Sequence, residues 1–177
     1  MEELVILVDH DDRETGVMEK IQAHREALLH RAFSVFVFNS KGELMLQQRA
    51  LGKYHSPGLW TNTCCSHPRP GEDTEAAAHR RLQEEMGFDC TLTKIFHFTY
   101  KAPFDNKLTE HEVDHVFVGF SDTLPVINPE EVESYRFATL DDISVEMAEN
   151  PELFTVWFQI AFERVAEYYL NRELKKS

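Results

Sequence analysis

The segment SHPRPGEDTEAAAHRRLQEEMGF, residues 66–88, predicts a helix with defined ends. Asp73 is a residue type that caps helix N-termini, and Glu75 suits the positive end of the helix dipole. Gly87 suits the left-handed residue that follows a helix. We therefore predict a helix over about residues 74–86 and place the other elements around it.

Four charged side chains lie in the last two turns of this predicted helix, namely Arg80, Arg81, Glu84 and Glu85. Glu84 and Glu85 are neighbours, so their side chains point about 100° apart. Arg81 and Glu85 are four residues apart and share a face. Taken alone, these charges indicate no more than a solvated helix end with an ion pair.

The rest of the chain is predicted to be rich in strands. The run NSKG at residues 39–42 is a turn signal between two strand-like runs, which favours a hairpin. Residues 50–71 contain Gly, Pro, Ser and His and predict a long loop, and such loops are usually functional. The predicted strands are residues 4–8, 31–39, 43–49, 90–100, 110–120 and 133–138, and the later helices are residues 140–149 and 152–170. This order predicts an α+β fold with a mixed β-sheet.

The last predicted helix carries an apolar stripe at Phe154, Trp157, Phe158, Ala161 and Val165. Apolar residues at this spacing lie on one face of a helix. Core packing explains the stripe without any functional role.

Length and charge limit the classes of protein. The 177 residues correspond to about one domain, which we predict to span residues 1–177. Thirty-one acidic and 18 basic residues give a net charge of −13, which argues against attraction to nucleic acid. No apolar run approaches the roughly 18 residues of a membrane-spanning helix, and the acidic start is not a signal peptide. We expect a cytoplasmic monomer with reduced cysteines and no membrane partner.

Three carboxylates alternate along one predicted strand. Residues Glu110, Glu112 and Asp114 lie on the same face, because side chains of a strand point alternately to its two sides. Parallel carboxylates repel each other unless a cation lies between them. A solvated sheet face is the simpler interpretation. It is weakened by Val116 and Val118, which continue the same face into the core.

Histidines and cysteines provide further candidates for a site. His24, His30 and His67 lie in loop-like segments, and Cys64 and Cys65 precede the last of these. Imidazole and carboxylate ligands suit Zn²⁺, Mn²⁺ or Fe²⁺, whereas carboxylates with phosphate suit Mg²⁺. A cysteine two residues from a metal-binding histidine could have a lowered pKa. Each of these residues taken singly is more often structural.

The combination of motifs resembles a known family. Segment 66–88 is similar to the Nudix box, and the matching residues are Glu72, Arg80, Leu82, Glu84, Glu85 and Gly87. Ser66 replaces the opening glycine of that box, and Arg81 replaces the glutamate of its Arg-Glu pair. With CCSHP at residues 64–68 and EHE at residues 110–112, this degenerate box resembles that of the type I isopentenyl-diphosphate isomerases, metal-dependent enzymes of isoprenoid biosynthesis. The resemblance covers about residues 4–170.

The resemblance implies a Nudix-like α/β/α sandwich and the interconversion of isopentenyl diphosphate and dimethylallyl diphosphate. In that reaction a proton is added to an alkene, a tertiary carbocation forms, and a second proton is removed. Cys65 and Glu112 match the two proton carriers of the family, and Tyr100 matches a tyrosine that assists the glutamate.

The same resemblance implies two metal sites and a substrate site. The residues that match the ligands of one divalent ion, Zn²⁺, Mn²⁺ or Mg²⁺, are His24, His30, His67, Glu110 and Glu112. Glu85 matches a ligand of Mg²⁺ that also binds the substrate diphosphate. The residues that match diphosphate contacts are Lys20, Arg49, Lys53 and Arg81, and Trp157 matches an aromatic side chain that faces the hydrocarbon.

Two other functions stay open at this point. A Nudix hydrolase acting on a nucleoside or terpenoid diphosphate would keep the fold and release phosphate. Arg81 argues against it, because a hydrolase uses a carboxylate at that position for another metal ion. A non-enzymatic, metal-bound binding module would not need both Cys65 and Glu112.

Overall fold

The computed structural model describes residues 3–176. The elements follow in the order β1 (Leu4–Val8), β2 (Glu14–Glu19), α1 (Lys20–Arg25), β3 (His30–Phe38), β4 (Glu43–Arg49), β5 (Trp60–Thr61), β6 (Cys64–Ser66), α2 (Thr74–Met86), β7 (Leu92–Pro103), β8 (Thr109–Phe120), β9 (Val132–Thr139), α3 (Leu140–Glu149), a 3₁₀ turn (Pro151–Leu153) and α4 (Val156–Leu174). Among the described residues, no helix is both long and apolar enough to cross a membrane.

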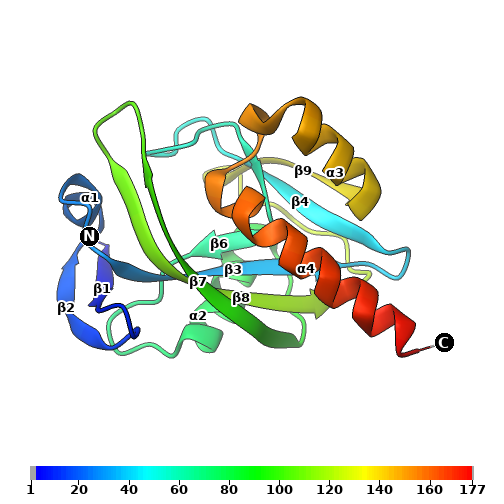
Figure 1. Ribbon diagram of the computed structural model, residues 1–177, viewed down its shortest axis with the longest axis horizontal. Coiled ribbons are helices and arrows are strands. Elements are labelled where there is room, and N and C mark those ends of the chain that lie inside the picture. The colour runs from blue at the N-terminus through cyan, green and yellow to red at the C-terminus, as the bar shows by residue number, and fades with distance from the viewer. Residues whose placement is uncertain (1–2, 177) are drawn as a thin grey trace.

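Strand β3 is the centre of a mixed sheet. It runs parallel to β8 over its whole length and antiparallel to β1, β4 and β6. Strands β7 and β8 form a long antiparallel hairpin, and β9 pairs antiparallel with β4 (Figure 1). The parallel register places His30 beside Glu112 and Ala32 beside Asp114. The start of β3 therefore meets the polar half of β8.

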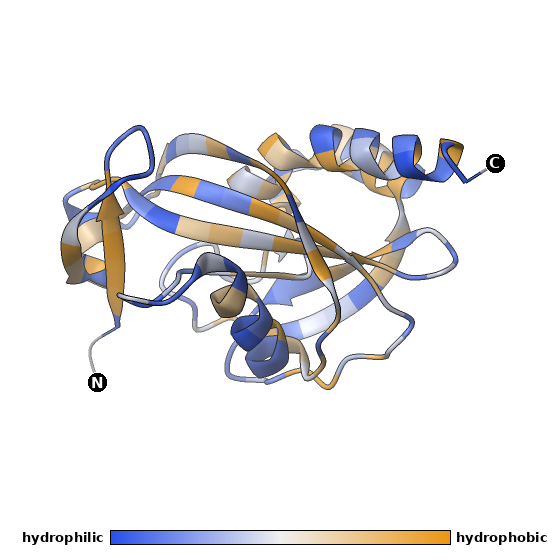
Figure 2. Cartoon of the chain, turned by 90° about the horizontal axis from the view of Figure 1, so that it is seen from below, coloured by the Kyte–Doolittle hydropathy of each residue, from blue (hydrophilic) through white to orange (hydrophobic). Residues whose placement is uncertain are grey.

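The sheet lies between two layers of helices. Figure 2 shows α4 on one side of the strands and α2 on the other. The core beneath α2 contains Ala78 and Leu82 from the helix and Phe33 from β3. The core beneath α3 and α4 contains Phe36 from β3 and Phe158 from α4. The predicted α/β/α sandwich with a mixed sheet is confirmed.

Helix α2 has the ends that its sequence predicts. The side chain of Asp73 accepts a hydrogen bond from the backbone N–H of Ala76 at 3.2 Å. Gly87 has a φ of +70°, and a Cβ at this position would lie 2.5 Å from the carbonyl oxygen of Val126. Glycine is therefore required at this helix end both for its backbone conformation and for the close approach of Val126.

Several local predictions are wrong. Strand β2 was not predicted, because no residue in it is buried and it therefore has no apolar alternation. Helix α1 has only six residues, too few for a helical period, so His24 lies in a helix rather than a loop. The predicted loop at residues 50–71 contains β5 and β6. Strand β6 is held by its pairing with β3, which its three residues do not indicate.

Candidate active site

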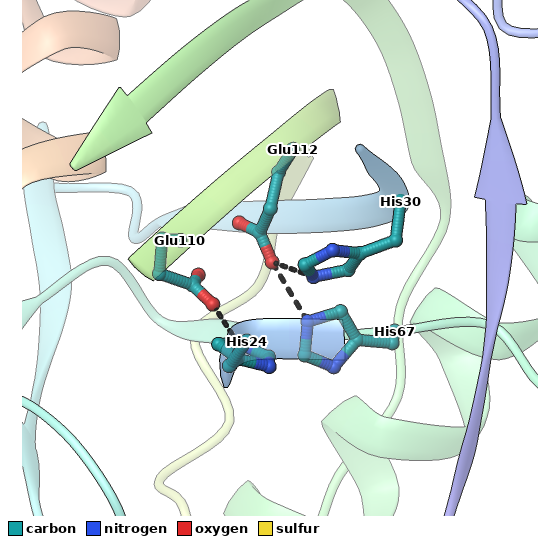
Figure 3. Close-up of side chains that lie close together, drawn as sticks. All are labelled: His24, His30, His67, Glu110 and Glu112. Atoms are coloured by element: carbon teal, nitrogen blue, oxygen red, sulfur yellow. Dashed lines mark hydrogen bonds and ion pairs between the residues drawn. The ribbon is translucent and has the colours of Figure 1, made fainter. Parts of the chain in front are cut away.

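Five metal-ligand side chains converge at one end of β8, and we call them the His/Glu cluster: His24, His30, His67, Glu110 and Glu112. Each offers one nitrogen or oxygen atom, and these atoms all lie within 4.8 Å of one another. They come from α1, the start of β3, the segment after β6, and β8, and Figure 3 shows the carboxylates facing the imidazole rings. Residues far apart in the sequence thus form one site.

The outward nitrogens of two imidazoles show how these rings are oriented. His24 Nδ1 lies 2.6 Å from the carbonyl oxygen of Lys20, and His30 Nδ1 lies 2.9 Å from that of Leu28. A carbonyl only accepts, so each Nδ1 carries a proton, and in a neutral ring Nε2 then presents a lone pair. This pattern, with the outer nitrogen donating to the backbone, is typical of metal-ligating histidines.

The inward nitrogens face carboxylate oxygens. His24 Nε2 contacts Glu110, and Glu112 Oε2 lies 3.1 Å from His30 Nε2 and 2.7 Å from His67 Nε2 (Figure 3). A proton or a metal cation must lie between the two atoms of each contact, because their lone pairs would otherwise repel each other. The donor set of three imidazoles and two carboxylates fits a divalent ion such as Zn²⁺ or Mn²⁺.

Burial shapes the electrostatics of the His/Glu cluster. The two glutamates are 3% and 4% exposed. Burial opposes the ionisation of Glu110, but the facing histidines outweigh it and hold its pKa well below the usual range. Burial also lowers the pKa of His67 to about 4, so this ring is neutral near pH 7. Ionised carboxylates and neutral imidazoles are the forms that bind metal ions.

The predicted proton carriers lie around the same cleft. Cys65, on β6, and Glu112 both line it. The hydroxyl of Tyr100 lies 2.5 Å from Glu112 Oε1 and 3.1 Å from Glu110 Oε2, because β7 pairs Tyr100 with Glu112 across the hairpin. Burial raises the pKa of Cys65 to about 12. The lowered pKa suggested by its spacing to His67 is therefore wrong, and the thiol keeps its proton near pH 7.

One wall of the cleft is apolar. Trp157, at the start of α4, is 3% exposed and packs with Tyr100, Ala102 and Phe104, and Cys65 contacts the same cluster. The predicted apolar stripe is buried as core packing requires, although Phe154 precedes α4, and its member Trp157 also lines the cleft. One helix face thus contributes both to the core and to the site.

Four basic side chains also line the cleft, and we call them the basic cluster: Lys20, Arg49, Lys53 and Arg81. Most of them pair with acidic residues of the chain. The Lys20 amine lies 2.5 Å from Glu3, and the Lys53 amine lies 2.6 Å from Glu131, which also contacts Arg81 at 3.3 Å. These cations provide an anion-binding surface within an acidic protein.

Glu85, the predicted Mg²⁺ ligand, lies outside the His/Glu cluster. It is 3% exposed, and its Oε2 accepts hydrogen bonds from Arg81 at 2.7 and 3.1 Å. Its Oε1 accepts a hydrogen bond from Gln47 at 3.0 Å. Arg81 and Glu85 share a face as predicted, whereas the neighbouring Glu84 is exposed. A buried carboxylate beside a basic cluster fits Mg²⁺ bound together with a diphosphate.

Sequence reasoning missed several residues of the cleft. Tyr54 and His55 lie in the segment between β4 and β5 and line the cleft, as does Glu131. Ser34 donates a hydrogen bond to Asp114 Oδ2 at 2.8 Å. The alternation of carboxylates on β8 pointed to Asp114, but no periodicity in residues 50–71 shows which side chains face the cleft.

Comparisons with known proteins agree with this geometry. A model of the NUDIX domain matches residues 28–158. The chain is 56% identical over 165 residues to an isopentenyl-diphosphate Delta-isomerase of Pectobacterium atrosepticum, covering 93% of this chain and 92% of that protein. It is 52% identical over 172 residues to an isopentenyl-diphosphate Delta-isomerase of Burkholderia multivorans, covering 97% and 98%.

Solved structures show the same fold at lower identity. A crystal structure of a Deinococcus radiodurans protein superposes with a TM-score of 0.78 at 22% identity, covering 92% of this chain and 98% of that one. A MutT NUDIX hydrolase from Burkholderia pseudomallei superposes with a TM-score of 0.63 at 21% identity, covering 77% and 98%. By its domain and by its relatives of more than 50% identity, the chain belongs to the isopentenyl-diphosphate Delta-isomerase family of NUDIX-domain proteins.

Proposed function

We propose that this chain interconverts isopentenyl diphosphate and dimethylallyl diphosphate in isoprenoid biosynthesis, as its relatives' names indicate for them. One observation supports this chemistry most strongly. A protonated thiol, Cys65, and a carboxylate, Glu112, line one cleft together with the buried aromatic Trp157 and the basic cluster. Such a cleft suits a substrate with a small hydrocarbon and a diphosphate.

The double bond of this substrate is not conjugated to a carbonyl, so a carbanion would have no stabilising group. The accessible route adds a proton at C4, places a positive charge on the tertiary carbon C3, and removes a proton from C2. Cys65 and Glu112 are the proposed proton donor and acceptor, and the Tyr100 hydroxyl orients the carboxylate. A positioned acid or base contributes typically about 10²–10⁴-fold in rate.

The carbocation must be kept from water, which would capture it as an alcohol. Trp157 and the residues packed around it form the proposed wall beside the hydrocarbon. An aromatic face stabilises a nearby cation by roughly 0.5–2 kcal/mol. The buried apolar wall therefore serves both to exclude water and to stabilise the intermediate.

The diphosphate provides binding energy away from the reacting carbons. The basic cluster is the proposed binding surface, with Arg81 donating charge-assisted hydrogen bonds to phosphate oxygens. The His/Glu cluster is the proposed site of one divalent ion, and Glu85 the proposed ligand of Mg²⁺. Bound ions would supply positive charge that fixes the Glu112 carboxylate and neutralises the diphosphate.

Hydrolysis of a diphosphate is the second candidate, because the fold is shared with NUDIX hydrolases. An arginine in place of the box glutamate leaves one carboxylate fewer for hydrolytic metal ions. The isomerase is therefore better supported.

Proton NMR of isopentenyl diphosphate with purified protein and Mg²⁺ tests the proposal. We expect the signals of dimethylallyl diphosphate to appear at constant total diphosphate. Release of inorganic phosphate without isomerisation would favour the hydrolase, and binding without any turnover would favour a binding module. The single-domain organisation, the monomeric state and the cytoplasmic location stay predictions.

A further inference from the structure

His55 is a buried histidine of the cleft without a role so far. It lies between β4 and β5, is 3% exposed, and lines the same cleft as Cys65 and Glu112. It does not belong to the His/Glu cluster. A buried polar side chain needs partners, and those of His55 connect different parts of the site.

The imidazole of His55 faces a proposed metal ligand. Its Nε2 lies 3.4 Å from Glu110 Oε1, the same oxygen that contacts His24. Its Nδ1 lies 3.2 Å from the hydroxyl of Ser56. An ionised carboxylate only accepts, so the nitrogen facing it must carry the proton, and the Ser56 hydroxyl then donates to Nδ1.

Aromatic rings fix the orientation of this imidazole. It stacks on Phe104 with 4.7 Å between ring centroids and 10° between planes. Trp157 packs edge-on at 5.7 Å, and Tyr54 packs edge-on at 4.4 Å. The ring cannot rotate without displacing the apolar wall, so the wall and the Glu110 carboxylate keep a fixed relation.

The backbone of His55 reaches the basic cluster. Its carbonyl oxygen accepts a hydrogen bond from Arg49 Nη2 at 3.1 Å. Arg49 also lies 5.3 Å from the Trp157 ring. One residue therefore contacts the His/Glu cluster, the apolar wall and the basic cluster.

We propose that His55 is a positioning residue, which holds the Glu110 carboxylate in its ligand orientation and sets the distance between that carboxylate and the apolar wall. The expected effect of His55 on kcat rests on the proposed function. Its effect on metal affinity does not depend on which reaction the site catalyses. Partners of metal ligands contribute typically about 10–100-fold in metal affinity or activity.

Two substitutions separate the polar contact from the packing. His55→Phe keeps an aromatic ring against Phe104 and Trp157 but removes the nitrogen that faces Glu110. His55→Gln restores an N–H donor on a flexible side chain. His97→Phe, on the exposed side of β7, is the matched control for loss of a histidine. Mn²⁺ affinity is measured by chelator competition, kcat and KM by proton NMR, and folding by circular dichroism.

We expect His55→Phe to fold, to weaken Mn²⁺ binding by about 10–100-fold, and to lower kcat while KM stays within about twofold. His55→Gln should recover at least part of the lost affinity, and His97→Phe should behave as wild type. Wild-type Mn²⁺ affinity and kcat in His55→Phe would overturn the proposal. Equal losses of kcat in His55→Phe and His55→Gln with unchanged Mn²⁺ affinity would also overturn it, because they would indicate that His55 contributes only its shape. A wild-type protein that binds Mn²⁺ but does not isomerise would refute the proposed function and leave the affinity test of His55 intact.

Discussion

The His/Glu cluster and the basic cluster lie in one cleft but hold their charges differently. The glutamates of the His/Glu cluster are almost fully buried and face imidazole nitrogens. The side chains of Lys20, Lys53 and Arg81 are 17–20% exposed and already pair with acidic residues. The carboxylates of the first cluster face imidazoles and the Tyr100 hydroxyl, whereas Lys20, Lys53 and Arg81 of the second pair with carboxylates of the chain.

This difference determines whether each cluster retains its bound ion or releases it in every turnover. Buried carboxylates without a cation are strongly unfavourable, so the His/Glu cluster suits an ion that stays through many turnovers. Partly exposed ion pairs contribute only about 0–1 kcal/mol each. Lys20 and Lys53 can therefore exchange Glu3 and Glu131 for a diphosphate at small cost, and release it again, whereas Arg81 stays paired with the buried Glu85.

The largest effect is expected from the proton carriers. Cys65→Ala and Glu112→Gln should fold and lose isomerase activity by about 10²–10⁴-fold or more. Cys64→Ala is the matched control, since Cys64 is fully buried in the core beneath α2 and should keep most activity. Turnover is measured by proton NMR. In D₂O the wild type should place deuterium in the methyl group derived from C4, and isomerisation without deuterium would exclude both assigned roles.

His67→Ala should empty the His/Glu cluster without affecting the basic cluster. Loss of the ring at 2.7 Å from Glu112 Oε2 removes a proposed ligand, so ion content and kcat should both fall. Elemental analysis after dialysis measures the ion, and the binding of inorganic diphosphate measures the basic cluster. Full ion occupancy with unchanged activity in this variant would show that the cluster is not the metal site.

Arg81→Ala should weaken diphosphate binding without affecting the His/Glu cluster. Loss of a charged hydrogen bond to the diphosphate should weaken substrate binding by about 1.5–3 kcal/mol, while ion content in the His/Glu cluster stays unchanged. Neighbouring carboxylates raise the pKa of Arg81 against the effect of its burial, so the side chain is charged at any accessible pH. If Arg81→Ala kept wild-type substrate affinity and hydrolysed the diphosphate, the assignment of Arg81 to the anion site would be wrong and a hydrolase would be favoured.

The sequence predicts the two clusters to different extents. Helix α2 was predicted to the residue because its cap at Asp73 and its C-terminal Gly87 are local signals. The same face for Glu110, Glu112 and Asp114 was predicted from alternation on one strand. The convergence of His24 with Glu110 depends on pairing between distant strands and on a six-residue helix, which no local pattern encodes. There the family resemblance, not the physics of the sequence, supplied the prediction.

Residues 50–71 show most clearly what could not be predicted from the sequence. A long loop rich in glycine and proline predicts function but not the direction of any side chain. His55 is buried only because Phe104, from the end of the β7–β8 hairpin, and Trp157, from α4, close around it. Such tertiary packing cannot be derived from a segment without periodicity. The internal partners of the basic cluster, Glu3 and Glu131, were missed for the same reason.

Acidification should affect the His/Glu cluster and the stability of the protein, but not the charge of the basic cluster. The unfolded chain takes up a proton on His67 near pH 6.5, whereas burial keeps the folded ring neutral down to about pH 4. The unfolded state therefore binds more protons in this window, and stability falls as the pH falls from about 6.5 to 4, by an amount on the order of 1–3 kcal/mol. Urea unfolding of the metal-free protein at pH 7 and pH 4.5 measures the loss. An identical loss in His67→Gln would show that another group is responsible.

The smallest effect concerns Glu131, which pairs with Lys53 at 2.6 Å and with Arg81 at 3.3 Å. If the substrate diphosphate replaces this carboxylate, Glu131→Gln leaves Lys53 without its competing anion and Arg81 with one anionic partner fewer. KM should then fall, by an amount equivalent to about 0.2–1 kcal/mol, and ion content in the His/Glu cluster should not change. The gain should shrink with added salt, because these charges are partly exposed and screened. Glu146→Gln is the matched control. Glu146 lies on α3 and pairs with Arg136 of β9, so its substitution should leave KM unchanged. A rise of KM in Glu131→Gln would mean that this carboxylate positions the two cations instead of competing for them, and the basic cluster would then resemble the His/Glu cluster in depending on a fixed internal partner.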